Sequence, residues 1–224
     1  MPDSLNICMV ARKFPILGRA TDHGFLWPVA RGLVDRGHKV TILSWTNPDK
    51  KSVIEQDGVK AIFIGQGHGF SPGAYPEAVA AQFAELHRER PFDILHSIDS
   101  GGIIIGKKKS LFRIAVAYDV EATQLSQIYS ILGMNQENIS SLLSTAINVT
   151  YKFLTTYFGR DRSLLKTADA LFVTSPQQRL ALERYYLYPE LKTHIVPYGI
   201  EISDLSPREV RIKYKLQTYR IFYS

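Results

Sequence analysis

Residues 164–207 read LLKTADALFVTSPQQRLALERYYLYPELKTHIVPYGIEISDLSP, and this stretch decides the fold. It contains a β-rich run at 170–174, an amphipathic run at 176–188 and a second β-rich run at 193–197. Ser175 and Gln178 have the spacing of a capping box, so a helix should begin at Pro176. A strand, a helix and a strand in this order predict one crossover unit of a parallel sheet.

The same alternation extends back to the start of the chain. Several of the β-rich runs are continuously apolar, as expected for strands that are buried on both faces. Gly37 should end the first helix. The expected strands are 5–10, 39–43, 60–64, 93–97, 114–118, 170–174 and 193–197, and the expected helices are 25–36, 76–90, about 136–168 and 176–188. We therefore predict the α/β class, with a Rossmann-like parallel sheet and helices on both faces.

The last residues have the pattern of a new structural unit. Ser206 and Glu209 form a second capping box around Pro207, and residues 219–224 have strand composition. A helix followed by a lone strand is typical of the opening of a second domain. We therefore expect residues 1–205 to form one domain, and residues 206–224 to form a linker helix and the first strand of a further domain.

The chain is basic, with a formal net charge of +6. Such a charge favours nucleic acid, an anionic membrane surface or a phosphorylated substrate as a partner. No nucleic-acid-binding motif accompanies the charge, so we predict no nucleic-acid partner. The one dense cluster is Lys107, Lys108 and Lys109. We favour a solvated helix end for these lysines, and peripheral contact with the inner face of a membrane stays open as the alternative.

Cys8 is the only cysteine, and its apolar surroundings (ICMV) predict a buried structural thiol. The six histidines lack the spacing of metal ligands, so no metal is expected. The sequence opens without a basic and apolar leader, and no apolar run reaches the roughly 18 residues of a membrane-spanning helix. These features predict a cytoplasmic protein.

Ligands of an open parallel sheet bind beyond the carboxyl ends of the strands, so the residues after each strand are the candidates for a site. The loop after the first expected strand is long, which is typical of functional loops. His23 lies in this loop, just before the first expected helix. It either faces a ligand or caps the helix together with Asp22, and we weigh the two roles equally.

Polar residues also follow the fourth and fifth expected strands. His96 lies near the end of the fourth strand, where a core position is at least as probable as a ligand contact. Asp99 and Ser100 are followed by two glycines, which would allow a close approach of the backbone to a ligand. Asp119 and Glu121 follow the fifth strand and should project to one side of an extended segment. Either carboxylate could accept hydrogen bonds from sugar hydroxyls or act as a general base, and Glu121 could instead favour a helix N-terminus.

Three segments resemble glycosyltransferase family 4 of the GT-B fold. The opening ICMVARKFPILG, continued by FLWPVARGLVDRGHKVTILSW, resembles the family's first strand, loop and helix. FDILHSID resembles its Asp-hydrophobic-hydrophobic-His strand, and ADALFVTSPQQRLALERYY with KTHIVPYGIE resembles its strand, helix and Pro-Asn-Gly segment. The order and spacing of these segments identify the chain as resembling the N-terminal half of a GT-B enzyme along nearly its whole length.

The resemblance implies an activity. Enzymes of this family transfer a sugar from a nucleotide-sugar donor to an acceptor, with retention at the anomeric carbon, and need no cofactor. Their C-terminal domain holds most donor contacts. The resemblance therefore implies that this chain supplies the acceptor side of the cleft, for a glycan or a lipid-linked acceptor, and that it is inactive by itself.

The departures from the family pattern define further candidates. The family's Gly-Gly pair in the first loop falls on Ala20 and Thr21 here, so either Gly18 or Gly24 is expected to take its place. Asp119 stands where many members have a histidine. Its carboxylate would accept a hydrogen bond from a sugar hydroxyl, a role different from that of an imidazole. The family's Pro-Asn-Gly reads Pro197-Tyr198-Gly199, which places Tyr198 and Gly199 at the base of the expected cleft.

The leading hypothesis is thus the acceptor-binding half of a retaining glycosyltransferase, with Asp119 and His96 as catalytic residues. The expected substrate-binding residues are Gly18, His23, Gly24, Asp99, Glu121, Tyr198 and Gly199. The alternative is a ligand-binding module of Rossmann type without catalysis. A nicotinamide-dependent oxidoreductase is disfavoured, because the first strand lacks the glycine fingerprint of such enzymes.

Overall fold

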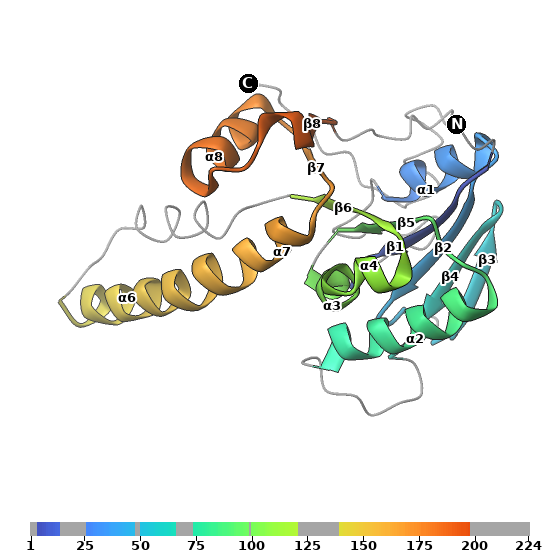
Figure 1. Ribbon diagram of the computed structural model, residues 1–224. Helices are drawn as coiled ribbons and strands as arrows, with labels where there is room; N and C mark the ends of the chain where they lie inside the picture. The colour runs from blue at the N-terminus through green and yellow to red at the C-terminus, as the bar shows by residue number, and fades with distance from the viewer. Residues whose placement is uncertain are drawn as a thin grey trace, which may run out of the picture.

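The computed structural model describes residues 4–13, 26–47, 50–65, 74–98, 100–120 and 139–197 (Figure 1). Within these residues the strands are β1 (Asn6–Val10), β2 (Lys39–Ser44), β3 (Val53–Gln56), β4 (Val59–Phe63), β5 (Ile94–Ser97), β6 (Ala115–Asp119), β7 (Ala170–Val173) and β8 (Thr193–Ile195). They form one sheet in the order β3-β4-β2-β1-β5-β6-β7-β8. All neighbours are parallel except β3 and β4. The predicted α/β fold is confirmed, and the expected linker at 206–224 lies outside the described residues.

Helices pack against both faces of this sheet, as predicted. Their bounds are α1 (Leu26–Asp35), α2 (Tyr75–Glu89), α3 (Ile103–Lys107), α4 (Lys109–Phe112), α6 (Ile139–Lys152), α7 (Arg162–Thr167) and α8 (Pro176–Tyr186). In Figure 1, α1 lies on one side of the sheet, and α2, α3, α4 and α7 lie on the other. Each side has its own core, and the two cores share no side chain because successive strand residues point to opposite faces.

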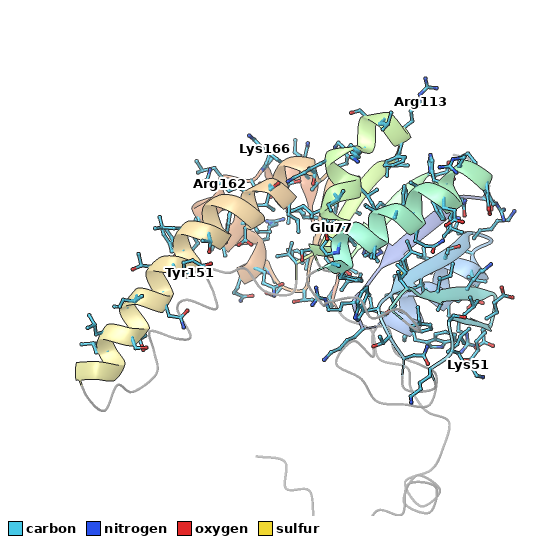
Figure 2. All side chains as sticks on the ribbon, turned by 90° about the horizontal axis from the view of Figure 1, so that it is seen from below. Lys51, Glu77, Arg113, Tyr151, Arg162 and Lys166 are labelled. Carbon is cyan, nitrogen blue, oxygen red and sulfur yellow. The ribbon has the colours of Figure 1, made fainter. Side chains whose placement is uncertain are left out.

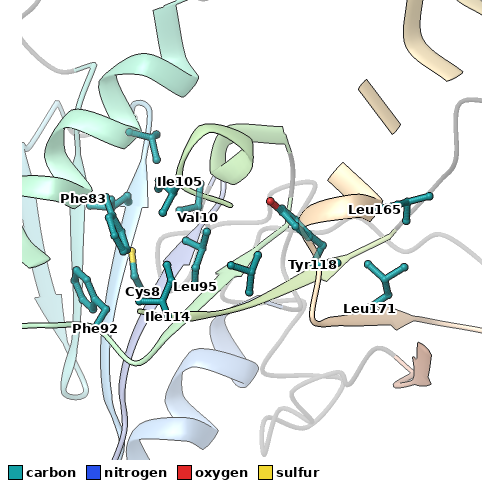
Figure 3. Close-up of a cluster of buried hydrophobic side chains, with 14 of the residues drawn as sticks. Cys8, Val10, Phe83, Phe92, Leu95, Ile105, Ile114, Tyr118, Leu165 and Leu171 are labelled. Atoms are coloured by element: carbon teal, nitrogen blue, oxygen red, sulfur yellow. The ribbon is translucent and has the colours of Figure 1, made fainter. Parts of the chain in front are cut away.

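Strand β1 shows why several strands of the sheet have continuously apolar sequences. Cys8 and Val10 belong to the larger core, where they meet residues such as Phe83 (Figure 3). Ile7 and Met9 belong to the smaller core under α1. The Cys8 thiol is completely buried, and burial raises its pKa. The prediction of a buried structural thiol is confirmed.

The helix ends follow the expected local signals. Gly37 has a φ of 86° just after α1, and its N–H donates to the Val34 carbonyl at 2.8 Å. The Ser175 hydroxyl oxygen accepts from the Gln178 N–H at 3.3 Å, as in a capping box. The Gln178 side chain, however, accepts from the Thr174 N–H at 2.8 Å. In a capping box the Gln178 side chain would accept from the Ser175 N–H, so this bond is shifted by one residue towards the N-terminus.

Two aspartates tie the amino ends of neighbouring strands together. Before β5, the Asp93 carboxylate accepts from the Asn6 N–H at 2.7 Å, while the Asp93 N–H donates to the Asn6 carbonyl at 2.8 Å. Before β7, Asp169 makes the same pair of bonds with Val116, at 2.9 and 2.8 Å. The Asp169 carboxylate also binds the Lys109 ammonium at 2.5 Å. The aspartates of FDIL and ADAL thus have a structural role at the edge opposite the expected site.

Replacement of Asp169 by asparagine should make the free energy of unfolding vary less with pH in the acidic range. Burial raises the pKa of Asp169, but bonds from Lys109 and the Val116 N–H outweigh it and lower the pKa overall. A lowered pKa in the folded state means that the contribution to stability is complete above the unfolded pKa, about 4, and is lost as the pH falls below it. Urea unfolding of both proteins from about pH 7 down to about pH 3 measures this difference. Asp57→Asn, at an exposed turn, is the control. If the wild type exceeded Asp169→Asn in free energy of unfolding by the same amount at every pH, a lowered pKa of Asp169 would be contradicted.

The long helical region expected at 136–168 is described from residue 139. It comprises α6, a π-helical segment (Phe153–Asp161) and α7, and we call these three the rod. The Thr155 hydroxyl donates to the Tyr151 carbonyl at 2.7 Å just where the helix widens, a bond that commonly disturbs helix geometry. In Figure 1 the α6 end of the rod extends well away from the sheet.

Candidate functional site

The carboxyl ends of β1, β2, β5, β6 and β7 meet at one edge of the sheet, since these strands are parallel. Of the nine candidate residues, the structure describes His96 and Asp119. The other seven lie outside the described residues: Gly18, His23, Gly24, Asp99, Glu121, Tyr198 and Gly199. The geometry of the candidate site therefore rests on His96, Asp119 and their neighbours.

His96 and Asp119 meet because of the register between β5 and β6. His96 pairs with Ala117, two residues before Asp119, so both side chains project from the same face of the sheet. Their closest atoms, His96 Nε2 and Asp119 Oδ2, are 3.2 Å apart. Asp119 is the last residue of its strand, whereas His96 is one level deeper. Asp119 is thus the member of the pair closer to the open edge.

The pair is mostly shielded from water. The side chain of His96 is 10% exposed and that of Asp119 is 14% exposed. Phe172 of β7 packs edge-on against the imidazole, with 5.4 Å between ring centroids. The two polar atoms are at ion-pair distance, but His96 Nε2 is buried without a hydrogen-bond partner among the described residues. Hydrogen bonds at ligand-binding edges are often poorly aligned before a ligand binds.

This arrangement can hold a carboxylate in place for chemistry. A buried imidazole 3.2 Å from Asp119 can donate a hydrogen bond to the carboxylate and so limit its rotation. The second carboxylate oxygen has no partner among the described residues, and it can accept a hydrogen bond from a ligand hydroxyl or take up its proton. His96, being deeper and packed on Phe172, is better placed to position Asp119 than to touch a ligand itself.

Arg12 is a site candidate that the sequence reasoning missed. It lies two residues after the end of β1, and its guanidinium carbon is 4.8 Å from the centre of the Tyr75 ring. Trp45 packs edge-on against the same ring, with centroids 5.6 Å apart. The Arg12 carbonyl accepts from the Trp45 N–H at 3.2 Å, which fixes the backbone here. A cation held over an aromatic face at the carboxyl edge suits an anionic ligand group, and the pair Arg12-Lys13 after the first strand was its signal in the sequence.

Gly102 has a structural role. A Cβ at this position would lie 2.6 Å from the Ser97 Oγ and 2.7 Å from the Ser97 Cβ. The Gly102 N–H donates to the same Ser97 oxygen at 3.1 Å, and Ser97 is completely buried. The glycine is therefore required where the chain after β5 folds back onto the strand.

The lysine cluster is divided between two roles. Lys109 is bound to Asp169, whereas Lys107 and Lys108 are exposed. Among the described residues, no helix combines the length and apolar character needed to cross a bilayer. In the same part of the chain, no three His, Cys, Asp or Glu side chains are grouped as metal ligands.

The sequence profile of the Glycosyl transferase 4-like domain matches residues 25–199. No curated protein matches the chain. Among solved structures, a sucrose-phosphate synthase from Thermosynechococcus elongatus is similar with a TM-score of 0.54 and 14% identity, over 94% of this chain and 96% of that one. Anabaena HepE, solved with UDP and glucose, has a TM-score of 0.54 and 14% identity, over 94% of this chain and 50% of HepE. A glycosyltransferase from Rickettsia africae has a TM-score of 0.52 and 16% identity, over 96% of this chain and 51% of that one.

These structural likenesses concern the fold, because the identities are low. The chain spans about half the length of HepE and of the Rickettsia protein.

Proposed function

Because the chain belongs to the glycosyltransferase 4-like family, we propose that it forms the acceptor-binding half of a retaining glycosyltransferase. In this proposal the complete protein moves a sugar from a nucleotide-sugar donor to a glycan or a lipid-linked acceptor. HepE has been solved with UDP-glucose, which supports a nucleotide-sugar as the donor. We expect residues 1–224 by themselves to be inactive, since the donor contacts would lie in a further domain.

One observation carries the proposal, namely the shielded pair of His96 and Asp119 at the carboxyl edge of the sheet. This edge is where open parallel sheets bind their ligands. In the proposal Asp119 accepts a hydrogen bond from a hydroxyl of the bound sugar, and His96 positions the carboxylate. Arg12 adds a cation for the diphosphate of the donor. The remaining proposed contacts are Gly18, His23, Gly24, Asp99, Glu121, Tyr198 and Gly199.

Catalysis in this proposal depends on positioning and electrostatics. The acceptor is held close to the anomeric carbon, so the reaction gains from proximity. Charge that develops on the leaving diphosphate is stabilised by cations and N–H groups of both halves. No metal takes part in the proposed mechanism.

The stereochemistry of the product tests the proposal. The full-length protein is incubated with a series of nucleotide-sugars, beginning with UDP-glucose, and the linkage of the product is read by proton NMR. Retention predicts that an α-configured donor yields an α-linked product. A β-linked product would contradict retention. Donor binding without turnover would favour the alternative, a binding module of Rossmann type.

Peripheral membrane contact remains part of the proposal for a lipid-linked acceptor. Lys107 and Lys108 are available for it, whereas Lys109 is engaged with Asp169. Exposed lysines near a surface of anionic lipids each favour association by about 1 kcal/mol.

A further inference from the structure

An open cavity lies at the edge of the sheet opposite His96 and Asp119. Its volume is about 560 Å³, and it lies between the end of the rod and the segment that connects α8 to β8. Ala168 and Lys192, two of its lining residues, directly precede Asp169 before β7 and Thr193 of β8. The cavity therefore opens at the amino ends of the strands, away from the edge of the proposed sugar transfer.

Among the described residues, three cations and no carboxylate line this cavity. Arg162 and Lys166 come from one side of the rod, one helical turn apart, and Lys192 comes from the opposite wall. All three are exposed. Figure 2 shows Arg162 and Lys166 in sequence along the rod.

The carboxylates near the cavity already have partners. Asp161 accepts from the Tyr186 hydroxyl at 2.6 Å. Asp169 accepts from Lys109 at 2.5 Å and from the Val116 N–H, and it also attracts Lys192. Lys109 offsets the charge of Asp169, whereas Asp161 keeps its charge because its partner is a neutral hydroxyl. The three cations of the lining still outnumber this carboxylate, so an anion would balance the remaining positive charge.

Neutral hydroxyls accompany the cations. Ser163 lines the cavity beside Arg162, and Tyr188 lines the wall that carries Lys192. The Tyr188 hydroxyl is buried without a hydrogen-bond partner among the described residues. Burial raises the pKa of Tyr188 to about 12, so this group stays protonated at neutral pH and can donate.

We propose that this cavity binds a phosphate group carried by an organic molecule. Cations on two walls can reach different oxygens of one tetrahedral anion, and a guanidinium pairs with two phosphate oxygens at once. A volume of about 560 Å³ exceeds that of a phosphate and leaves room for the group that carries it.

Two sources of this phosphate are compatible with the cavity, a soluble phosphate ester and a lipid headgroup. The rod favours the lipid. Its α6 end exposes a stripe of apolar side chains, with Leu143 63%, Ile147 64% and Tyr151 67% exposed, at a spacing of four residues. Leu187 is 80% exposed at the rim of the cavity. Apolar groups on the same rod as the cations of the cavity, with Leu187 at its rim, suit the interface between headgroups and acyl chains.

The test compares the full-length protein with two triple variants of equal charge. The first, Arg162→Gln/Lys166→Gln/Lys192→Gln, neutralises the cavity. The second, Lys50→Gln/Lys51→Gln/Arg88→Gln, neutralises exposed cations that do not line it. One arm titrates glycerol 3-phosphate by calorimetry. The other arm sediments the protein with phosphatidylcholine vesicles, either pure or containing phosphatidic acid.

We expect the wild type and the second variant to bind at least one of the two probes, and the first variant to bind it at least about tenfold more weakly. Binding of glycerol 3-phosphate alone assigns a soluble ester, and binding of the phosphatidic acid vesicles alone assigns a lipid headgroup. Equal losses in both triple variants would reveal attraction by net charge only and overturn the proposal. Absence of wild-type binding to both probes would also overturn it.

Discussion

Replacement of Asp119 by alanine should abolish sugar transfer by the full-length protein while the domain stays folded. The carboxylate lies at the end of β6, 3.2 Å from His96, at the edge where ligands of parallel sheets bind. Loss of a general base or of an electrostatic contact to a reacting sugar lowers kcat by about 10²–10⁴-fold. Asp119→Asn should show nearly the same loss, because the amide keeps the shape but lacks the charge. Initial rates of product formation, with circular dichroism as the check on folding, measure the effect.

Asp57→Asn is the matched control for this prediction. Asp57 has a φ of 48° in an exposed turn, a conformation that asparagine adopts readily, so neither folding nor transfer should change. A purely structural role of the His96–Asp119 pair would give the opposite pattern. Asp119→Asn would then lower the melting temperature and leave the rate per folded molecule unchanged.

His96→Gln tests whether the imidazole acts through Asp119. If it only positions the carboxylate, the double variant with Asp119→Asn should be no slower than Asp119→Asn alone, since residues that act as a unit are not additive. Independent contributions would instead multiply the two losses.

The parallel core was predictable because its signal is strong and local. The apolar run of β1 is buried on both faces, so the residues from Ile7 to Val10 all favour the same element. The signals at Gly37 and Ser175 confirm where the adjoining helices end and begin. Each of these features depends on a few neighbouring residues, which is why they could be read without a structure.

Strand β3 was missed although its turn has a clear signature. Asp57 and Gly58 have φ values of 48° and 77°, as in the two-residue turn that joins hairpin strands. The strand itself reads VIEQ and pairs only with β4 at the edge of the sheet. Too little of it is apolar for its composition to favour a strand. The strand forms because its backbone pairs with β4. The short helices α3 and α4 were missed for a similar reason, because four or five residues carry little periodic signal.

The positions of the candidate site residues in the chain were predictable, but the contact between His96 and Asp119 was not. Sequence reasoning placed Asp119 next to Glu121, its neighbour in the chain, because both follow the same strand. The structure brings Asp119 to His96 of the adjacent strand, and that contact depends on a register that no local pattern reveals. Arg12 was overlooked for the same reason, since its partner Tyr75 is distant in the sequence.

Replacement of Gly106 by alanine should destabilise the protein by about 1–3 kcal/mol, the usual cost of an added methyl group in a packed core. A Cβ on Gly106 would collide with the Tyr118 hydroxyl and come within 3.0 Å of the Thr167 Oγ1. These two oxygens are 3.1 Å apart, and their bond joins β6 to α7 beneath α3. Tyr118 is completely buried, so its ring cannot move aside to relieve the collision. Urea unfolding compared with the wild type measures the loss.

A second substitution distinguishes this collision from any destabilising effect of alanine in α3 that does not involve Tyr118. Tyr118→Phe removes the colliding oxygen and by itself costs about 1 kcal/mol for the lost hydrogen bond. In that background Gly106→Ala should cost clearly less than in the wild type, which a double-mutant cycle detects as a coupling energy. Gly32→Ala in α1 is the control, because the nearest atom to its Cβ is the flexible end of Arg36, and it should stabilise the helix by about 0.5–1 kcal/mol. Equal costs of Gly106→Ala in both backgrounds would show that the close approach of α3 to Tyr118 is not what requires the glycine.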